Sequence, residues 1–571
     1  SETPGAIFRR NANGNFRSIN EFEPIPGNIC DPITAPAGAP PNFVRFRCPV
    51  TNYNAGGPGF LQDTNTHRIV ARSVATVLAE ALGHHVAKAG FEFEYVSYQS
   101  ARGYSGGNLF RENLTGARWD DFRNYNYTTQ PDAFVPVKAL NWTTQSFGVG
   151  GFIQDSWSIL DKVTLNVGLG WNGQFLFGGD GKPSMNLPQQ WSPRVGLIWD
   201  PTQQGRSKIY ANYARYYTAI PLNLMDRAGS LETGAISRRP QAACNPLDPA
   251  QGRGVCTDPA NLLTFHDPEP DRRYIRQGVA QTPIANDLEP TQQDELAAGG
   301  ELDVIKNGRV GVFYTKRWLG KAIEDISRDS ANTYFIANPG FGAASDFPRA
   351  VRDYDAFTVF FQKAFADGWI AQANYTLAFL RGNYEGLFRS ETGQLDPFIT
   401  SLFDLPDLVA NKNGPLGGDR THEIKLFGAK DFEIPGDMLL QIGGSFRATS
   451  GNPTSYLGSH WLYGLDEIAM LKVGEGNRLP WSYRFDLRVG YAFKLGREQS
   501  IQLSMDVFNL FNFQAVTARD QRYTSSDVLP LENGTRVALD RADGQSPFVT
   551  FDPASTPTTA PFTPDQINPN F

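Results

Sequence analysis

Long hydrophobic runs are absent from this sequence of 571 residues, although apolar residues make up 40% of it. A membrane-spanning helix needs about 20 consecutive apolar residues, and no stretch reaches about 18. Positive charge is also scarce, since 52 Lys and Arg are outnumbered by 59 Asp and Glu, for a formal net charge of −7. Without a basic surface or a long run of Lys or Arg, we expect no nucleic-acid partner.

Cysteine is rare as well, and its four residues fall into two local pairs in Pro- and Gly-rich stretches. One pair is Cys30 and Cys48, and the other is Cys244 and Cys256. No close Cys-Cys or Cys-His spacing favours zinc, so we predict two disulfides, with metal ligation or free thiols as the alternative. Disulfides form in oxidising compartments, which indicates the periplasm or the cell exterior.

Aromatic residues are abundant: they make up 12% of the sequence, and 40 Phe and 21 Tyr account for most of them. Such residues favour strands. The 56 Gly and 39 Pro indicate many short elements joined by turns and loops. The mean hydropathy of −0.36 is compatible with strands that expose only every second side chain to lipid.

A period of two is the dominant pattern, and it is clearest at 481–493, 163–171 and 86–95. Apolar residues occupy one face of each segment and mostly polar or small residues the other, so the two faces contact different solvents. We predict that these apolar side chains face lipid: Phe91, Phe93, Leu165, Val167, Leu169, Phe485, Leu487 and Val489. We predict that these charged side chains face a lumen: Lys88, Glu92, Glu94, Arg484, Asp486 and Arg488.

The same test predicts fourteen strands, at 66–78, 86–97, 145–157, 163–175, 191–200, 207–217, 290–303, 309–319, 353–365, 369–381, 420–431, 437–449, 481–493 and 500–513. Short connections are expected at 79–85, 158–162, 201–206, 304–308, 366–368, 432–436 and 494–499. Long connections are expected at 98–144, 176–190, 218–289, 320–352, 382–419 and 450–480.

The alternation of short and long connections is typical of an outer-membrane barrel, whose periplasmic turns are short and whose extracellular loops are long. Backbone groups in hydrocarbon must all be hydrogen-bonded internally, so strands cross a bilayer only as a closed barrel. The predicted fold class is therefore an all-β, transmembrane antiparallel β-barrel. We therefore expect the chain to lie in the bacterial outer membrane, in contact with outer-membrane lipid.

Several segments resemble the barrel of TonB-dependent outer-membrane receptors and transporters, in particular the Oar-like branch. They are Gly-Phe-Ile-Gln-Asp-Ser-Trp at 151–157, Leu-Asn-Val-Gly-Leu at 165–169, Trp-Ser-Pro-Arg-Val-Gly at 191–196, Ala-Thr-Ser-Gly-Asn-Pro at 448–453, and Asp-Val-Phe-Asn-Leu-Phe-Asn-Phe at 506–513. The resemblance implies a barrel of twenty-two strands and a preceding plug domain that engages TonB.

Placed in that barrel, the fourteen predicted strands fit as the eighth to the twenty-first, which leaves seven strands before and one after. We expect the biological protein to be longer than this chain, or its wall to be completed by another chain. The domains predicted here are an extracellular loop region with a disulfide at 1–65, the transmembrane strands at 66–513, and a last extracellular loop at 514–571 that leads to a missing closing strand.

Candidate sites follow from the predicted lumen and loops. The six charged lumen residues are plug-contact candidates by the resemblance, and plain hydration of the lumen is the alternative. The long loop at 218–289 is the candidate for ligand recognition, because exposed loops on a rigid scaffold usually carry recognition. No catalytic residue, metal ligand or cofactor motif is found, so an enzyme is not predicted.

The resemblance implies a receptor or transporter that binds a ligand through extracellular loops and passes it across the outer membrane when TonB acts on the plug. The ligand is an unknown molecule or partner protein. The alternative is a structural, adhesin-like or secretion-associated barrel without TonB-driven uptake, since fold does not dictate function. A secreted all-β enzyme such as a propeller lacks the expected repeats of about 40–50 residues.

Overall fold

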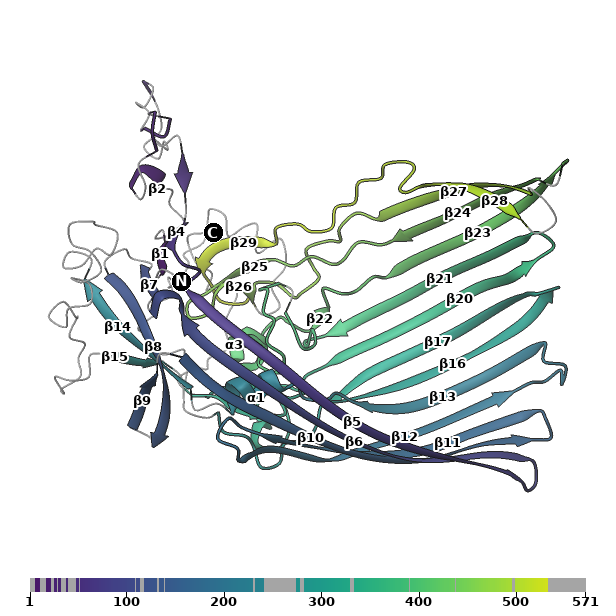
Figure 1. Cartoon of the computed structure of the whole chain (residues 1–571), viewed down its shortest axis with the longest axis horizontal. Helices are drawn as coiled ribbons and strands as arrows, with labels where there is room; N and C mark the ends of the chain where they lie inside the picture. The colour runs from purple at the N-terminus through teal and green to yellow at the C-terminus, as the bar shows by residue number, and fades with distance from the viewer. Residues whose placement is uncertain are drawn as a thin grey trace.

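An antiparallel sheet of fourteen main strands dominates the computed structural model of the chain (Figure 1). The structure describes residues 6–10, 17–21, 25–27, 29–31, 37–38, 48–50, 52–107, 109–112, 118–130, 133–137, 139–229, 232–240, 274–277, 282–328, 333–389, 391–436, 438–494 and 499–531. Within these residues, each strand of the main sheet pairs with its neighbours in chain order. Strands β5 and β28 form the two edges.

The fourteen strands are β5 (Phe60–Glu80), β6 (His84–Tyr104), β10 (Ala139–Ile159), β11 (Val163–Phe177), β12 (Pro183–Trp199), β13 (Ser207–Tyr217), β16 (Gln292–Ile305), β17 (Gly308–Lys321), β20 (Arg352–Ala366), β21 (Trp369–Gly382), β23 (His422–Ile434), β24 (Met438–Thr449), β27 (Ser482–Lys494) and β28 (Ser500–Val507). A two-residue strand, β22 (Gly414–Pro415), also pairs with β21. Each of the fourteen predicted segments overlaps one main strand, and the predicted fold class is confirmed.

Several strand ends differ from prediction. Strand β6 extends to Tyr104 and β10 begins at Ala139, both inside the predicted long connection 98–144. Strand β5 begins at Phe60, inside the region 1–65 that was predicted to be loop. Strand β28 ends at Val507, although the prediction continued it to 513. The chain turns away there because the Asn509 amide donates to the Asp486 carboxylate at 2.8 Å and Asn509 has a φ of 50°.

One end of the sheet carries only tight connections. Asn307 joins β16 to β17 with a φ of 57°, and Asp367 and Gly368 join β20 to β21 with φ values of 53° and 75°. Asn, Asp and Gly tolerate this left-handed region best, which is why such short turns close here. At the opposite end of the sheet one connection is also short: the long connection predicted at 176–190 was wrong, because β11 and β12 extend toward each other and the Gly178 amide closes a turn onto the Lys182 carbonyl at 3.0 Å.

The opposite end carries the long connections, and these contain smaller sheets that the sequence pattern did not predict. One sheet joins β1 (Ala6–Arg10), β4 (Asn52–Gly56), β7 (Leu109–Glu112), β8 (Arg118–Gln130), β9 (Ala133–Val137), β14 (Glu232–Pro240) and β15 (Tyr274–Gln277). The others are β2 (Arg17–Ser18) with β3 (Pro49–Val50), β18 (Glu324–Ile326) with β19 (Phe335–Ala337), and β25 (Leu457–His460) with β26 (Gly464–Ala469) and β29 (Arg522–Asp527).

Short helices complete the loop end: α1 (Leu222–Ala228), α3 (Pro406–Val409), and the 3-10 turns η2 (Ile19–Glu21), η3 (Ser105–Gly107), η5 (Gly342–Ala344) and η6 (Ser401–Phe403). No helix among the described residues has the length and apolar character needed to cross a membrane. The predicted disulfide between Cys30 and Cys48 is confirmed, with Cα atoms 5.1 Å apart. The predicted Cys244–Cys256 pair lies outside the described residues.

Buried apolar side chains gather at the loop end in three clusters. The first packs α1 against the ends of β11 and β12 and against Ile336 and Phe398. The second joins the 322–351 and 383–421 connections, with Phe403 fully buried in it. The third joins the 383–421 and 450–481 connections to the segment after β28. Neighbouring loops are therefore packed together as one assembly.

Candidate functional site

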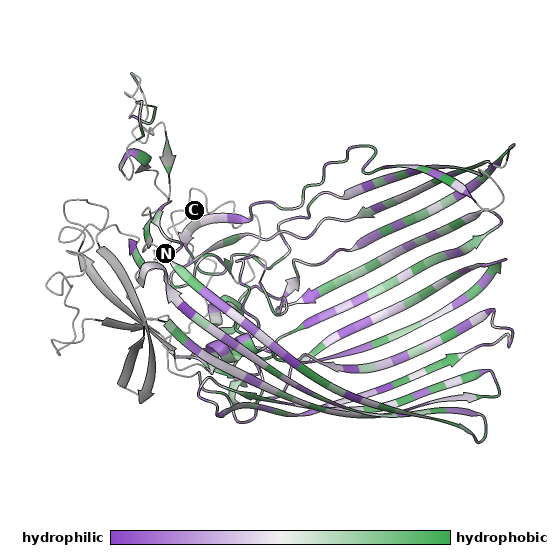
Figure 2. Ribbon diagram, viewed as in Figure 1, coloured by the Kyte–Doolittle hydropathy of each residue, from purple (hydrophilic) through white to green (hydrophobic). Residues whose placement is uncertain are grey.

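The ladder register shows which predicted side chains share a face of the sheet, because directly paired residues of neighbouring strands point to the same side. From β6 to β27, the register places all six predicted lumen residues on one face. It places all eight predicted lipid-facing residues on the other. Figure 2 shows the resulting alternation of polar and apolar residues along each strand. We call the first face the polar face.

Loop elements cover the polar face at the loop end. Helix α1 and the residues just before it lie against this face through hydrogen bonds from polar-face side chains: Trp142 Nε1 donates to the Asp226 carboxylate of α1 at 3.1 Å, and Gln174 Nε2 donates to the Ile220 carbonyl at 2.9 Å. Arg102, on the same face of β6, forms an ion pair with Asp226. The interior of an outer-membrane barrel is polar, so this face corresponds to the predicted lumen side, and its contact with a lumen stays a prediction.

The six polar candidates form two separate groups, since ten strands from β10 to β24 lie between β6 and β27. On β6, Glu94 pairs with Arg68 at 2.9 Å and Glu92 lies 3.8 Å from Arg72. On β27, Arg484 pairs with Asp486 at 2.9 Å, and Arg488 pairs with Asp506 on β28 at 3.3 Å. Lys88 belongs to the first group through its place on β6. Their contact with a plug stays a prediction.

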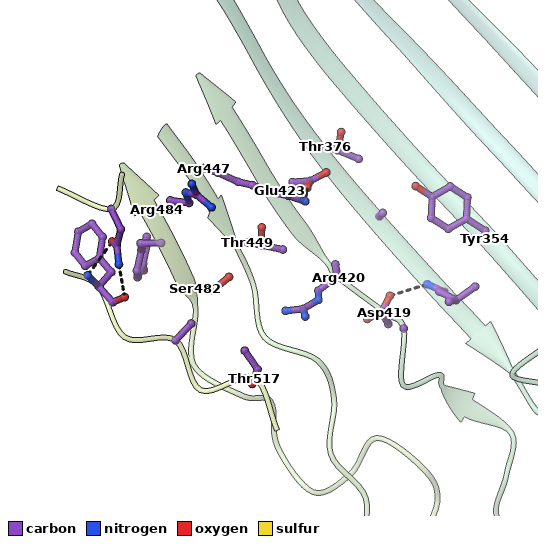
Figure 3. A pocket seen from close by; sticks show the side chains of 17 residues that line it. Tyr354, Thr376, Asp419, Arg420, Glu423, Arg447, Thr449, Ser482, Arg484 and Thr517 are labelled. Carbon is purple, nitrogen blue, oxygen red and sulfur yellow. Dashed lines mark hydrogen bonds and ion pairs between the residues drawn. The ribbon is translucent and has the colours of Figure 1, made fainter. Parts of the chain in front are cut away.

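Of these candidates, only Arg484 lines a cavity of about 630 Å³ on the polar face (Figure 3). Strands β20, β21, β23, β24 and β27 form its wall near their loop ends, and the segment at 509–517 closes one side. Its charged lining residues are Asp419, Arg420, Glu423, Arg447 and Arg484.

Both carboxylates that line this cavity already have hydrogen-bond and ion-pair partners within the protein. Asp419 is almost fully buried, accepts from the Leu380 amide at 2.6 Å and forms an ion pair with Arg478. Glu423 accepts from Arg447 at 2.6 Å and from Lys425 at 2.7 Å, and its side chain is only 22% exposed. The accessible charge is therefore that of the guanidinium groups.

The guanidinium groups are more open. The side chains of Arg447 and Arg484 are 61% and 58% exposed. Arg420 is also exposed and donates to the Ser450 carbonyl at 2.9 Å, with no ion-pair partner among the described residues. Sequence reasoning missed Arg447 and Arg420. The signal for Arg447 was present, because Arg447 and Ser445 alternate with apolar neighbours on the predicted strand 437–449. Arg420 begins the predicted strand 420–431 but lies two residues before β23 in the structure, so the strand pattern did not assign it to the polar face.

At the loop end, the loops meet in a buried network of charged side chains. Arg389 has a fully buried side chain that forms an ion pair with Glu467 and lies 3.8 Å from Glu391. Lys412, also buried, lies 3.4 Å from Glu391. Ser401 Oγ donates to Glu467 at 2.8 Å. These contacts connect the loop after β21 to the loop after β24.

Buried carboxyl groups extend this network into the loop after β17. Glu324 is fully buried and accepts from the Thr400 amide at 2.8 Å and its hydroxyl at 3.0 Å. Burial raises the pKa of Glu324 to about 8. Burial also raises the pKa of Asp404 and that of its neighbour Asp325, so these carboxyl groups hold protons above their ordinary range. Among the residues that the structure describes, no group of three His, Cys, Asp or Glu is arranged to hold a metal ion.

The chain is similar to known proteins in both sequence and fold. A family model described as "TonB dependent receptor-like, beta-barrel" matches residues 44–510. The chain is 43% identical over 550 residues to the TonB-dependent transporter Oar of Myxococcus xanthus. That match covers 93% of this chain and 51% of the relative, so the chain spans about half the length of the curated relative.

Solved structures with a similar arrangement include the outer membrane transporter YddB from Escherichia coli, at 15% identity and a TM-score of 0.43. That match covers 84% of this chain and 54% of the other. The siderophore receptor PiuA from Acinetobacter baumannii matches at 12% identity with a TM-score of 0.45, over 84% of this chain and 56% of the other.

Proposed function

The chain belongs to the TonB dependent receptor-like β-barrel family of the bacterial outer membrane, and we propose that it forms the wall of a receptor that imports a ligand. The family is one of receptors and transporters. In the proposed role, the extracellular loops bind a ligand, TonB acts through a plug that contacts the polar face, and the ligand passes through the barrel without covalent chemistry.

The observation that carries this proposal is the covered polar face. Loops at one end fold against the polar face, and an accessible cavity lies beneath them at the ends of five adjacent strands. Ligand sites are usually such concave regions, held by a rigid scaffold. A scaffold or adhesin has no need for such a cavity.

The ion pairs on β6 and β27 support plug contact. Their side chains are half-exposed on the polar face, so a docked domain can accept or donate hydrogen bonds there without rearranging the wall. Exposed pairs of this kind contribute little to the stability of the barrel itself, at most about 1 kcal/mol each.

Growth of cells on limiting nutrients tests the function. We expect that deleting the gene and deleting TonB produce the same growth defect on at least one nutrient source, and that combining the deletions adds nothing. Re-expression of the full-length gene restores growth only where TonB is present. A deletion strain that loses adhesion or a surface protein, with every growth profile unchanged, supports the structural or secretion-associated alternative instead.

A further inference from the structure

We propose that the cavity lined by Arg420, Arg447 and Arg484 binds a ligand that carries an oxyanion group, a carboxylate or a phosphate, on an apolar body. This proposal rests on the proposed receptor function and specifies its ligand class. Its observations are the open guanidinium groups, the occupied carboxylates and the composition of the cavity wall.

The charged residues that line the cavity determine whether it favours an anionic or a cationic ligand. Asp419 is buried and held by Arg478 and a backbone amide, and Glu423 is held by two cations, so neither carboxylate is free for a cationic ligand. Arg447 and Arg484 each use one side of the guanidinium group for an internal partner and are more than half exposed. A guanidinium group has five N–H donors, so the remaining donors are available to an oxyanion.

Arg420 adds to the preference of the cavity for an anionic ligand. Its Nη1 donates to a backbone carbonyl, which leaves its charge without a carboxylate among the described residues. Figure 3 shows Arg420, Arg447 and Arg484 along one cavity, contributed by the segment before β23, by β24 and by β27. An anion bound in this cavity would have three guanidinium groups in its lining, and Arg groups suit planar, bidentate recognition of carboxylates and phosphates.

The rest of the lining fits a ligand with an apolar body. Tyr354, Ala378, Leu380 and Phe513 provide apolar and aromatic surface, whereas Thr449 and Ser482 add hydroxyl groups next to the arginines. The volume of about 630 Å³ lies in the range of small-molecule sites, which is roughly 300–1,000 Å³. A bare inorganic ion leaves most of this space unfilled.

The test measures binding to the full-length protein, purified in detergent micelles, by isothermal titration calorimetry at low salt. Phenyl phosphate and benzoate are the two oxyanion probes, benzyl alcohol is their neutral counterpart, and inorganic phosphate lacks the apolar body. We expect one or both oxyanion probes to bind at least tenfold more tightly than benzyl alcohol and than inorganic phosphate. Whichever of the two binds more tightly identifies phosphate or carboxylate as the recognised group.

Two variants on the polar face provide a matched comparison. Arg484→Gln removes a cavity guanidinium from β27, and Arg309→Gln removes one from β17, where the side chain is 42% exposed, pairs with Glu301 and Asp303, and lies outside the cavity lining. We expect Arg484→Gln to weaken probe binding roughly tenfold, because it removes a charged hydrogen-bond donor, and Arg309→Gln to leave it unchanged. Arg447→Gln is expected to behave like Arg484→Gln.

Folding of each variant is checked by its heat-modifiable migration on a denaturing gel. The proposal is overturned if neither oxyanion probe binds, if benzyl alcohol binds as tightly as they do, or if Arg309→Gln weakens binding as much as Arg484→Gln. The growth tests are independent of this one. TonB-dependent growth with no probe binding refutes only the ligand class, whereas probe binding without TonB-dependent growth refutes only the import function.

Discussion

The two ends of the main sheet are built differently. At the turn end, connections of two to seven residues are closed by local contacts, such as the Asp200 carboxylate, which accepts from the Gly205 amide at 2.7 Å and from the Ser207 hydroxyl at 2.9 Å. At the loop end, residues far apart in sequence meet in three apolar clusters and a buried network of charged groups.

This difference shows which connections are stabilised by their own residues and which are stabilised by contacts with other connections. The side-chain contacts of the 200–206 turn are made within the turn, while backbone hydrogen bonds such as that from the Asp200 amide to the Lys162 carbonyl at 2.8 Å continue the sheet, so we expect a side-chain substitution there to have a local effect. Each loop depends on its neighbours, because Arg389 and Glu467, or Glu324 and Thr400, come from different loops. We therefore expect single substitutions to have large and spreading effects at the loop end and small, confined ones at the turn end.

The largest expected effect comes from Arg389→Ala. It leaves Glu467 and Glu391 buried without their guanidinium partner, and breaking a buried pair in this way costs about 3–5 kcal/mol. Hydrogen exchange should show lost protection in 383–421 and 450–481 together. The matched control is Arg68→Ala, at an exposed pair with Glu94, which should cost at most about 1 kcal/mol. Equal effects of the two variants would contradict the comparison.

A smaller effect is expected from Met225→Ala in α1. Met225 is fully buried among side chains from four segments, and truncation leaves a cavity that costs roughly 3 kcal/mol. Exchange protection should fall in α1 and also near Ile336 and Phe398, which pack in the same cluster. If protection falls in α1 alone, the loops are not coupled as proposed. Leu302→Ala, on the exposed apolar face, is the control and should leave all of these segments unchanged.

We expect a change of pH to alter the stability of the packed loops less than either of these substitutions does. Burial raises the pKa of Glu324 from 4.5 to about 8, so this group favours the packed loops fully below pH 4.5 and loses that effect as the pH rises through 8. Exchange protection of the Thr400 region, corrected for intrinsic rates, should therefore be higher at pH 5.5 than at pH 8.5. Each proton released changes the opening equilibrium by at most about tenfold per pH unit.

Glu324→Gln is the variant that isolates this titration, because glutamine keeps the acceptor oxygen for the Thr400 amide and does not ionise. Its Thr400 region should show a shallower dependence on pH than the wild type. A steeper or equal dependence would assign the pH effect to other groups, foremost Asp404 and Asp325.

The smallest effect is expected from Asp200→Asn at the turn end. Hydrogen bonds, first from the Thr202 hydroxyl, hold the pKa of Asp200 at about 2, so its contribution is present above pH 3.8 and is lost only as the pH falls through 2. Faster exchange should be confined to residues 200–206, with the same difference from wild type at every pH from 5 to 8. Spreading of the change into β13, or a pH-dependent difference in this range, would argue against a purely local turn.

The sequence predicts the wall of the molecule better than its site. Period two identifies the fourteen strands and the two faces, because the solvent on each face selects the side chains, as at Phe485 against Arg484. The small sheet that contains β8 and β14 was missed because its pairing joins segments more than a hundred residues apart. The cavity was missed for the same reason, since its lining comes from five strands and a later segment.

The shared clusters at the loop end also have an evolutionary consequence. A sequence change in one loop alters the surroundings of two or three others, so ligand preference is expected to diverge among relatives by compensated substitutions rather than by independent ones. For protein engineering, the loops from β13 to β28 form one transferable unit, with Phe398, Phe403 and Leu408 at its centre. Transplanting a single loop would separate side chains that have adapted to each other.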